Sequence, residues 1–189
     1  MLGDWRIRFA ALQLARSGVI AYPTEAVYGL GCDPLDERAL LRLYELKGRP
    51  ASKGFILIAS DWCQLESFVK PLDESMIGEQ RMVEIMAGWP GPNTWILPAR
   101  SGLPMLLVGE RGSLAVRVTA HPLAARLCRA VGGPIVSTSA NHSGQAPARS
   151  VLEVRLRFAH RIDYLLSGPL GGDARPSVIR DGVTGQQLR

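Results

Sequence analysis

The stretch LKGRPASKGFILI, residues 46–58, places cationic side chains directly before an apolar run. The chain has 22 Lys and Arg residues, but only three are Lys, and two of these, Lys47 and Lys53, lie here with Arg49 between them. Lys47 and Arg49 flank Gly48, so an ammonium and a planar guanidinium can converge on one phosphate or carboxylate. The alternative is a basic helix C-terminus whose charges complement the helix dipole. The spacing alone leaves both interpretations open.

A second polar segment, STSAN at residues 137–141, follows directly on the apolar residues PIV. Hydroxyl and amide groups at the end of a strand can hold phosphate or carboxylate oxygens without adding charge. The alternative is a capped turn, since Ser, Thr and Asn are common turn formers. A nucleophilic serine is disfavoured, because the chain has no GxSxG elbow.

Arg117 lies between two valines in the strand-like segment LAVRVT. A guanidinium in such a position is costly to bury unless it is paired. The segment therefore predicts an exposed edge strand, an anion clamp inside a site, or a pair with a buried carboxylate.

Several classes of site are disfavoured by the sequence. It has no P-loop and no GxGxxG fingerprint, so any nucleotide must be held by another device. The three cysteines and three histidines lack metal-ligand spacing, so we expect no structural metal. The net charge of +5 favours anionic partners, either nucleotides or RNA. With 6% aromatic residues and no RNP-like cluster, a stacking platform for single-stranded RNA is poorly supported.

The bulk properties predict one cytoplasmic domain. A length of 189 residues suits a single core. No apolar run approaches the roughly 20 residues that span a bilayer. The N-terminus lacks a basic stretch followed by an apolar segment, so we expect no signal peptide.

Apolar strands are expected to alternate with amphipathic helices along the chain. Helices are predicted at residues 5–17 after Asp4, at 37–47 after Asp36, and at 73–87, 121–131 and 151–158. A short helix that contains Leu65 and Phe68 is predicted after Ser60 or Asp61. Strands are predicted at residues 19–22, 55–59, 113–119, 162–166 and 176–181. A further strand is predicted after a Pro/Gly turn within 89–99, and another at 134–141, where the strand runs into small polar residues. A glycine-containing loop is predicted at 23–35. This alternation is typical of an α/β domain with a mostly buried sheet.

Six segments in a fixed order resemble the YrdC-like family, and within it the short, single-domain bacterial branch. They are YPTEAVYGLGCDPL, LKGRPASKGFILIAS, WPGPNTWILPA, SLAVRVTAHPLA, PIVSTSANHSGQAP and PSVIRDGVTGQQLR, and they cover the chain from Val19 to Arg189. The resemblance implies a single YrdC-like domain over residues 1–189. Its fold would be a twisted, open, mixed sheet with flanking helices around a concave basic cavity.

The resemblance also implies an activity. Members of the family make threonylcarbamoyl-adenylate and pyrophosphate from L-threonine, bicarbonate and ATP, which is a nucleotidyltransferase reaction. Partner proteins then transfer the threonylcarbamoyl group to an adenosine beside the anticodon of tRNA. Mg²⁺ is expected on the ATP phosphates, with no metal cage in the protein. Two alternatives remain: a double-stranded RNA-binding or ribosome-maturation protein that uses the same basic cavity, and a carbamoyl-transfer module of the kind found inside larger maturation proteins.

Site residues follow from the resemblance position by position. The catalytic residues would be those of the K-x-R and S-x-N elements, namely Lys47, Arg49, Ser139 and Asn141. The ATP site would comprise Lys47, Arg49, Lys53, Ser113, Ser139, Asn141 and Arg189. The threonine site would comprise Thr24, Arg117, Ser137 and Ser177. Because both reacting groups are anionic, we expect the cations Lys47, Arg49, Lys53 and Arg117 to neutralise their repulsion.

The chain departs from the wider family at two positions expected to touch threonine. Ala26 stands where many relatives have Thr, and Ile58 stands where many have His. The threonine side chain would then be read by Thr24 and by backbone groups of the PTEAVYG loop.

Overall fold

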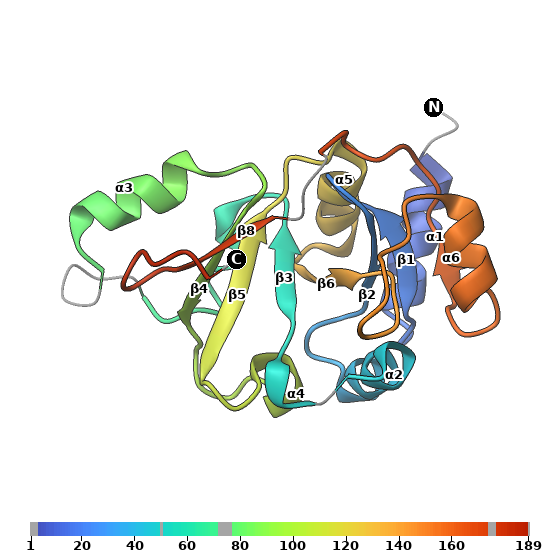
Figure 1. Cartoon of the computed structure of the whole chain (residues 1–189), viewed down its shortest axis with the longest axis horizontal. Helices are drawn as coiled ribbons and strands as arrows, with labels where there is room; N and C mark the ends of the chain where they lie inside the picture. The colour runs from blue at the N-terminus through green and yellow to red at the C-terminus, as the bar shows by residue number, and fades with distance from the viewer. Residues whose placement is uncertain (1–3, 50, 72–76, 174–176, 189) are drawn as a thin grey trace.

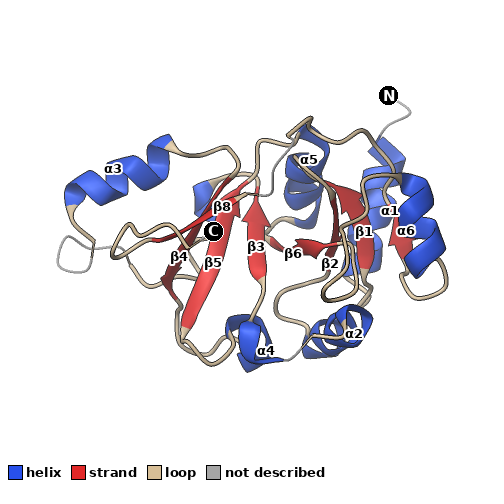
Figure 2. Cartoon of the chain, in the orientation of Figure 1, coloured by secondary structure: helices blue, strands red, loops and turns tan. Residues whose placement is uncertain are grey.

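An eight-stranded mixed β-sheet runs through the middle of the computed structural model, and helices lie around it (Figures 1 and 2). The structure describes residues 4–49, 51–71, 77–173 and 177–188. The strands are β1 (Ile20–Pro23), β2 (Tyr28–Gly31), β3 (Ile56–Ala59), β4 (Asn93–Pro98), β5 (Ser113–Val118), β6 (Ile135–Ser139), β7 (Tyr164–Leu165) and β8 (Val178–Asp181). Their order in the sheet is β7-β1-β2-β6-β3-β5-β4-β8.

Six α-helices and two short 3₁₀ turns connect the strands in the described ranges. The helices are α1 (Asp4–Leu14), α2 (Glu37–Lys47), α3 (Glu79–Ala87), α4 (Met105–Val108), α5 (Pro122–Val131) and α6 (Val151–Phe158), and the turns are Ala51–Lys53 and Trp62–Gln64. None of these helices is both long enough and apolar enough to cross a membrane. The predicted α/β class with a mixed sheet and flanking helices is confirmed.

The two faces of the sheet are covered by different helices. On one face, α1 and α5 contact each other and bury an apolar cluster that includes Leu14, Ile58, Leu127 and Ile135. On the other face, a larger cluster joins strand residues such as Val116 to side chains of α2, α3, α4 and α6. Figure 1 shows α1, α5 and α6 gathered near β1, whereas α3 lies at the opposite end of the sheet. Two separate apolar layers therefore hold the sheet in place.

Helix α2 begins and ends where the sequence predicts. The Asp36 side chain accepts a hydrogen bond from the Ala39 backbone N–H, which caps the N-terminus. Gly48 ends the helix with φ 57°, a left-handed conformation that glycine adopts without steric cost. This sharp exit places Lys47 on the helix and Arg49 on the loop that leads to β3.

The predicted loop at residues 23–35 is wrong in its middle, where β2 forms. Its sequence YGLG has two glycines, and glycine weakens strand propensity, so the local pattern does not indicate a strand. At Gly31 the space for a side chain is lacking. A Cβ on Gly31 would lie 2.2 Å from the Val136 carbonyl oxygen and 2.8 Å from the Tyr22 ring. The buried Tyr22 ring therefore occupies the room that a side chain at this position would need.

Replacing Gly31 by alanine is expected to lower the free energy of unfolding by about 1–3 kcal/mol, because over-packing forces neighbouring atoms to shift. Chemical denaturation of the purified variant measures the change. Gly133→Ala is the matched control, since a Cβ there meets nothing within 4 Å. Equal stability of the two variants would show that the Tyr22 packing tolerates the methyl group.

Other element boundaries also differ from the prediction. Helix α1 starts at Asp4 itself and ends at Leu14 rather than at residue 17. The helix predicted at 73–87 begins at Glu79, and residues 72–76 lie outside the described ranges. The short helix after Asp61 is a single 3₁₀ turn, and α4 was not predicted at all, because MLLV is too short to show helical periodicity.

Candidate active site

Lys47 joins the end of α2 to the end of β6. Its Nζ donates to the Ser139 carbonyl oxygen at 2.5 Å and to Asn141 Oδ1 at 2.9 Å, and the side chain is only 4% exposed. The Ser139 hydroxyl donates to the same Asn141 oxygen at 2.6 Å. The Asn141 amide in turn donates to the carbonyl oxygens of His142 and Gln145. The K-x-R and S-x-N elements, whose Lys47 and Ser139 are 92 positions apart in the chain, thus meet in one polar cluster.

The environment of Lys47 weakens its hold on a proton. Burial, and to a lesser extent the neighbouring Arg49 guanidinium, lowers the pKa of the Lys47 ammonium to about 8. At neutral pH the group is still mostly charged. It is therefore a cation whose protonation responds to small changes nearby.

Arg49 is anchored on the loop that follows α2. Its Nη2 donates to the carbonyl oxygens of Lys53 and Gly54 at 3.0 and 2.7 Å, and its guanidinium lies 5.3 Å from the centre of the Phe55 ring. Within the described ranges, Arg49 Nε is buried without a hydrogen-bond partner. Lys53 itself is exposed. The loop therefore presents two cations beside the Lys47 cluster, one held by its neighbours and one exposed to solvent.

Ser113 lies close to this loop, at the start of β5. The strands β3 and β5 are parallel, with Ile56 paired to Ala115, so Ser113 falls beside the beginning of β3. The Glu110 backbone N–H donates to the Ser52 carbonyl oxygen, which ties the two segments together. Six of the seven predicted ATP residues thus gather at one end of the sheet, and the seventh, Arg189, lies outside the described residues.

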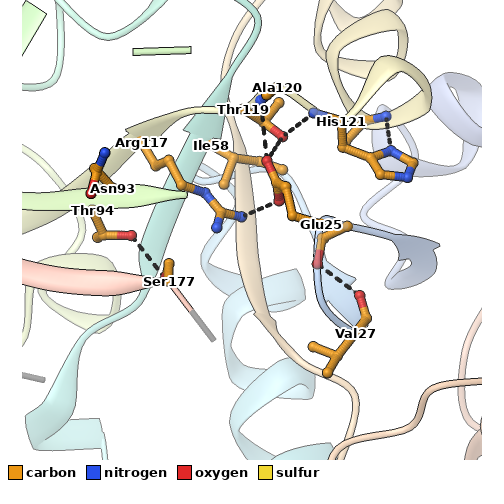
Figure 3. A network of polar contacts seen from close by, with 12 residues as sticks. Glu25, Val27, Ile58, Asn93, Thr94, Arg117, Thr119, Ala120, His121 and Ser177 are labelled. Atoms are coloured by element: carbon orange, nitrogen blue, oxygen red, sulfur yellow. Dashed lines mark hydrogen bonds and ion pairs between the residues drawn. The ribbon is translucent and has the colours of Figure 1, made fainter. Parts of the chain in front are cut away.

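A second polar cluster centres on Arg117 (Figure 3). Its Nη2 lies 3.2 Å from Glu25 Oε2, and both side chains are less than 10% exposed. The other Glu25 oxygen accepts from the Thr119 hydroxyl at 2.6 Å and from the Ala120 backbone N–H at 3.1 Å. Of the three interpretations of Arg117, the pair with a buried carboxylate is therefore present. The expectation that Arg117 adds a full positive charge to the Lys47 group is corrected, because Glu25 neutralises it.

A pair of hydroxyl groups lies next to Arg117. The Thr94 hydroxyl on β4 donates to the Ser177 hydroxyl at 3.1 Å, and the Thr94 side chain is fully buried. Trp95 pairs with Val116, so Thr94 falls opposite Arg117 in the antiparallel ladder. Ser177, predicted at the threonine site, is thus brought beside Arg117 through Thr94.

The remaining residues predicted at the threonine site, Ser137 and Thr24, are both buried. Ser137 on β6 is buried, and a Cβ on Gly29 would lie 3.5 Å from its hydroxyl oxygen. Thr24 is also buried, but its hydroxyl donates to the Val27 carbonyl oxygen at 2.7 Å within the loop. Only the acceptor capacity of the Thr24 oxygen is therefore left for a ligand.

Arg117, Ser137 and Ser139 lie on one face of the sheet. Ile56 pairs with Ser137 and Ile58 pairs with Arg117, and paired residues of adjacent strands point to the same face. Ser139 shares that face because side chains two residues apart on a strand do so. Arg117 is level with Ile135, four residues before Ser139, so the two positions are about 13 Å apart along the strands, and β3 lies between their strands. Ser137 lies between them.

The two departures from the wider family lie at the Arg117 end. Ile58 is fully buried in the apolar layer under α5, and Figure 3 shows it beside Arg117 and Glu25. Ala26 is 6% exposed on the same loop as Glu25. This end of the face is therefore lined partly by apolar groups.

The sequence analysis missed Glu25, Thr94 and Thr119. A signal for the first was present, because an arginine between valines demands a carboxylate and Glu25 is the only acidic residue of the PTEAVYG loop. Thr119 follows Arg117 by two residues and so shares its face, which the sequence also indicates. Thr94 gave no signal, since a threonine is ordinary in a strand.

A model of the Sua5, YciO and YrdC proteins, described as "Telomere recombination", matches residues 13–189. The chain belongs to this family. The resemblance noted in the sequence is thereby confirmed.

Relatives of the family with the name threonylcarbamoyl-AMP synthase match nearly end to end. The protein from Nitrosococcus oceani is 54% identical over 186 residues, which is 98% of each chain. The protein from Coxiella burnetii is 48% identical over 176 residues, covering 93% of this chain and 92% of its own.

Solved structures of the family share the fold. The P. abyssi Sua5 structure complexed with L-threonine superposes with a TM-score of 0.82 at 35% identity. It matches 94% of this chain, which spans 51% of the Sua5 chain. E. coli YciO superposes with a TM-score of 0.75 at 26% identity and covers 96% of this chain and 89% of its own.

Proposed function

We propose that this chain is a threonylcarbamoyl-AMP synthase. It is a nucleotidyltransferase that forms L-threonylcarbamoyladenylate and pyrophosphate from L-threonine, bicarbonate and ATP, and residues 1–189 act as a single YrdC-like domain. The observation that carries the proposal is the pair of polar clusters at Ser139 and at Arg117, one cationic and one dipolar, which lie about 13 Å apart along the strands and two strands apart across the sheet. The near full-length match to relatives of that name supports it.

The cationic end suits ATP. Lys47, Arg49 and Lys53 contribute positive charge, and the Ser113 hydroxyl can donate to a phosphate oxygen without adding more. The Ser139 hydroxyl, which donates to Asn141 Oδ1, would do so only after turning away from Asn141. A carbamate that attacks the α-phosphorus is itself an anion, so neutralisation at this end lowers the electrostatic barrier to their approach. Asn141 orients the Lys47 ammonium rather than the phosphate, because its oxygen is already the acceptor of Lys47 and Ser139.

The dipolar end suits threonine, and the likeness to P. abyssi Sua5, which was solved in complex with L-threonine, supports this assignment. The Arg117 guanidinium can bind the carboxylate of the amino acid. Ser137 shares the face of Arg117, and the Ser177 hydroxyl is held next to it by Thr94. Threonine held here would direct its amino group along the face towards ATP. Fixing both reactants in line supplies proximity without a covalent intermediate on the protein.

Mg²⁺ would enter with ATP as part of the substrate. Among the described residues no group of three His, Cys, Asp or Glu side chains is placed to hold a metal ion. The phosphate oxygens and water would then supply its coordination, which is common for Mg²⁺ at nucleotide sites.

The product would be consumed outside this chain. We propose that transfer proteins pass the threonylcarbamoyl group to tRNA in the cytoplasm, where the acceptor is found. The alternative of a double-stranded RNA-binding or ribosome-maturation protein is not favoured, because the full-length relatives carry an enzyme name.

Incubation of the purified protein with ATP, L-threonine, bicarbonate and Mg²⁺ tests the function. Mass detection should show the threonylcarbamoyl adenylate together with an equal amount of pyrophosphate. Omitting either threonine or bicarbonate should abolish both products. Hydrolysis of ATP without an adenylate, or salt-sensitive binding of double-stranded RNA with no turnover, would contradict the proposal.

A further inference from the structure

The Glu25 carboxylate is held in an unusual way for a structural ion pair. Its Oε1 accepts two hydrogen bonds, from the Thr119 hydroxyl and the Ala120 backbone N–H. Its Oε2 is buried and, within the described ranges, accepts none, although Arg117 Nη2 lies 3.2 Å away. Buried carboxylate oxygens normally have hydrogen-bond partners, so Oε2 is left with capacity for a donor.

Arg117 has spare capacity on the same side. Its Nε is also a buried donor without a partner among the described residues. An unsatisfied donor and an unsatisfied acceptor therefore belong to two buried side chains that lie side by side, and Figure 3 shows the ion pair that joins them. Although the two side chains are ion-paired, each of these buried atoms costs free energy while it lacks a hydrogen bond, and a ligand that bonds to both recovers that cost.

The backbone around Glu25 is fixed from outside the loop. The Gly171 N–H donates to the Thr24 carbonyl oxygen, and the Asp173 N–H donates to the Glu25 carbonyl oxygen. A Cβ on Gly171 would lie 2.8 Å from the Glu25 Cα, so the segment packs closely against it. The carboxylate is thus preorganised by contacts on both its backbone and its side chain.

Glu25 also stays ionised. Burial alone would raise the pKa of its carboxyl group, but the Arg117 guanidinium and the Thr119 hydroxyl outweigh burial and hold the pKa below its usual value. The group is therefore an acceptor for a cation at neutral pH and a poor base.

We propose that Glu25 and Arg117 together form a receptor for the two charged groups of an α-amino acid, with the α-ammonium on Glu25 Oε2 and the α-carboxylate on the Arg117 guanidinium. The inference rests on the proposed function and assigns the amino-group contact within it. The ammonium and carboxylate groups of an α-amino acid are bonded to the same carbon atom, so their opposite charges are close enough to match an ion pair whose charged atoms are 3.2 Å apart. Because receptor and ligand are each neutral overall, the match leaves no uncompensated buried charge.

The contact also suits the later steps of the reaction. Once the amine has become a carbamate, its nitrogen keeps one N–H, which can still donate to Glu25 Oε2. The nitrogen then stays in place while the new carboxylate group points along the sheet face towards the Lys47 end. Glu25 is thus a substrate-binding residue at the amino group and not the base. When the ammonium and bicarbonate form the carbamate, one of the two protons lost leaves in the water that is released and the other goes to solvent.

A ligand pair separates the ammonium contact from the carboxylate contact. (R)-3-hydroxybutyrate has the carboxylate, hydroxyl and methyl groups of L-threonine but lacks its ammonium. We expect Glu25→Gln, which keeps an oxygen for Thr119 and Ala120, to raise the Kd of L-threonine at least tenfold. It should change the Kd of (R)-3-hydroxybutyrate and of ATP less than twofold. Calorimetry and competition measure the three affinities, and Glu66→Gln, at an exposed carboxylate, is the matched control.

The kinetic readout should agree with the binding data. The KM for threonine should rise in Glu25→Gln while the KM for ATP stays unchanged. An equal loss of affinity for threonine and for (R)-3-hydroxybutyrate would show that Glu25 only positions Arg117. Unchanged affinity for both ligands would show that the Glu25–Arg117 ion pair is purely structural. Both results overturn the receptor. If Glu25→Gln does not fold, Glu25→Asp, which retains the charge but shortens its reach, should show the same selective loss for threonine.

The wild-type protein separates failure of this inference from failure of the proposed function. A wild type that binds ATP but not L-threonine refutes the function itself, and the receptor with it. A wild type that binds L-threonine and (R)-3-hydroxybutyrate equally well refutes the ammonium contact alone.

Discussion

Replacing Arg49 by alanine is expected to lower the rate of threonine-dependent pyrophosphate formation at least tenfold. A charge-assisted hydrogen bond to phosphate is worth about 1.5–3 kcal/mol, and about 1.4 kcal/mol corresponds to a factor of ten in rate. Arg49 can still donate a hydrogen bond, because its Nε–H is buried without a partner among the described residues. Release of pyrophosphate under saturating threonine and bicarbonate measures the effect.

The fold should survive this substitution. The contacts of Arg49 are two backbone carbonyl oxygens of its own loop and the face of the Phe55 ring, so no buried acid is left unpaired. Arg38→Ala, at an exposed position on α2, removes the same charge as a control and should keep full activity. Arg49→Lys should recover only part of the rate, since an ammonium lacks the planar fork. Near-normal turnover of a folded Arg49→Ala protein would remove Arg49 from the ATP site.

The sequence predicted the parts of the fold that have strong local signals. Helix α2 was placed correctly because an Asp cap, an apolar stripe and a terminal glycine agree with one another. Strand β2 was missed because Gly31 is needed for close packing against the Val136 carbonyl oxygen and the Tyr22 ring, and not for the local backbone conformation. The order of the strands in the sheet depends on such long-range packing, so local patterns could not predict it.

The same difference between local signals and long-range contacts explains which residues of the candidate site could be predicted. Lys47 and Asn141 were singled out because each stands in a short polar element next to apolar segments, and the structure brings them within hydrogen-bond distance. Their roles towards ATP stay a prediction. Glu25 was missed because its importance comes from pairing with Arg117, far along the chain, and one loop carboxylate has no local periodicity to mark it.

Lys47→Met is expected to reduce kcat/KM for ATP at least tenfold. Methionine fills a similar volume but removes the ammonium that Ser139 and Asn141 hold at the end of β6. Loss of a charge next to the phosphates raises the barrier to attack by an anionic carbamate. Lys70→Met, at an exposed lysine, is the control and should leave the rate unchanged. Wild-type kcat/KM in folded Lys47→Met would show that the cluster is only a structural link between α2 and β6.

The pH dependence of kcat/KM for ATP shows whether the charge of the Lys47 side chain, and not only its packing, is needed for activity. Because the pKa of Lys47 in the folded protein is about 8, kcat/KM for ATP should fall above about pH 8 as the ammonium loses its proton. Lys47→Arg should move that fall to higher pH, since a guanidinium keeps its charge.

The stability of the folded protein should change with pH in the opposite direction. The unfolded chain holds the Lys47 proton up to the ordinary lysine pKa of 10.5, so between about pH 8 and 10.5 it binds more protons than the folded one. The contribution of Lys47 to the free energy of unfolding therefore rises with pH across this window, and this rise should be absent in Lys47→Met. A protein that gains stability where it loses activity would show that the ammonium is kept at a cost to folding, for the sake of the anionic ligand.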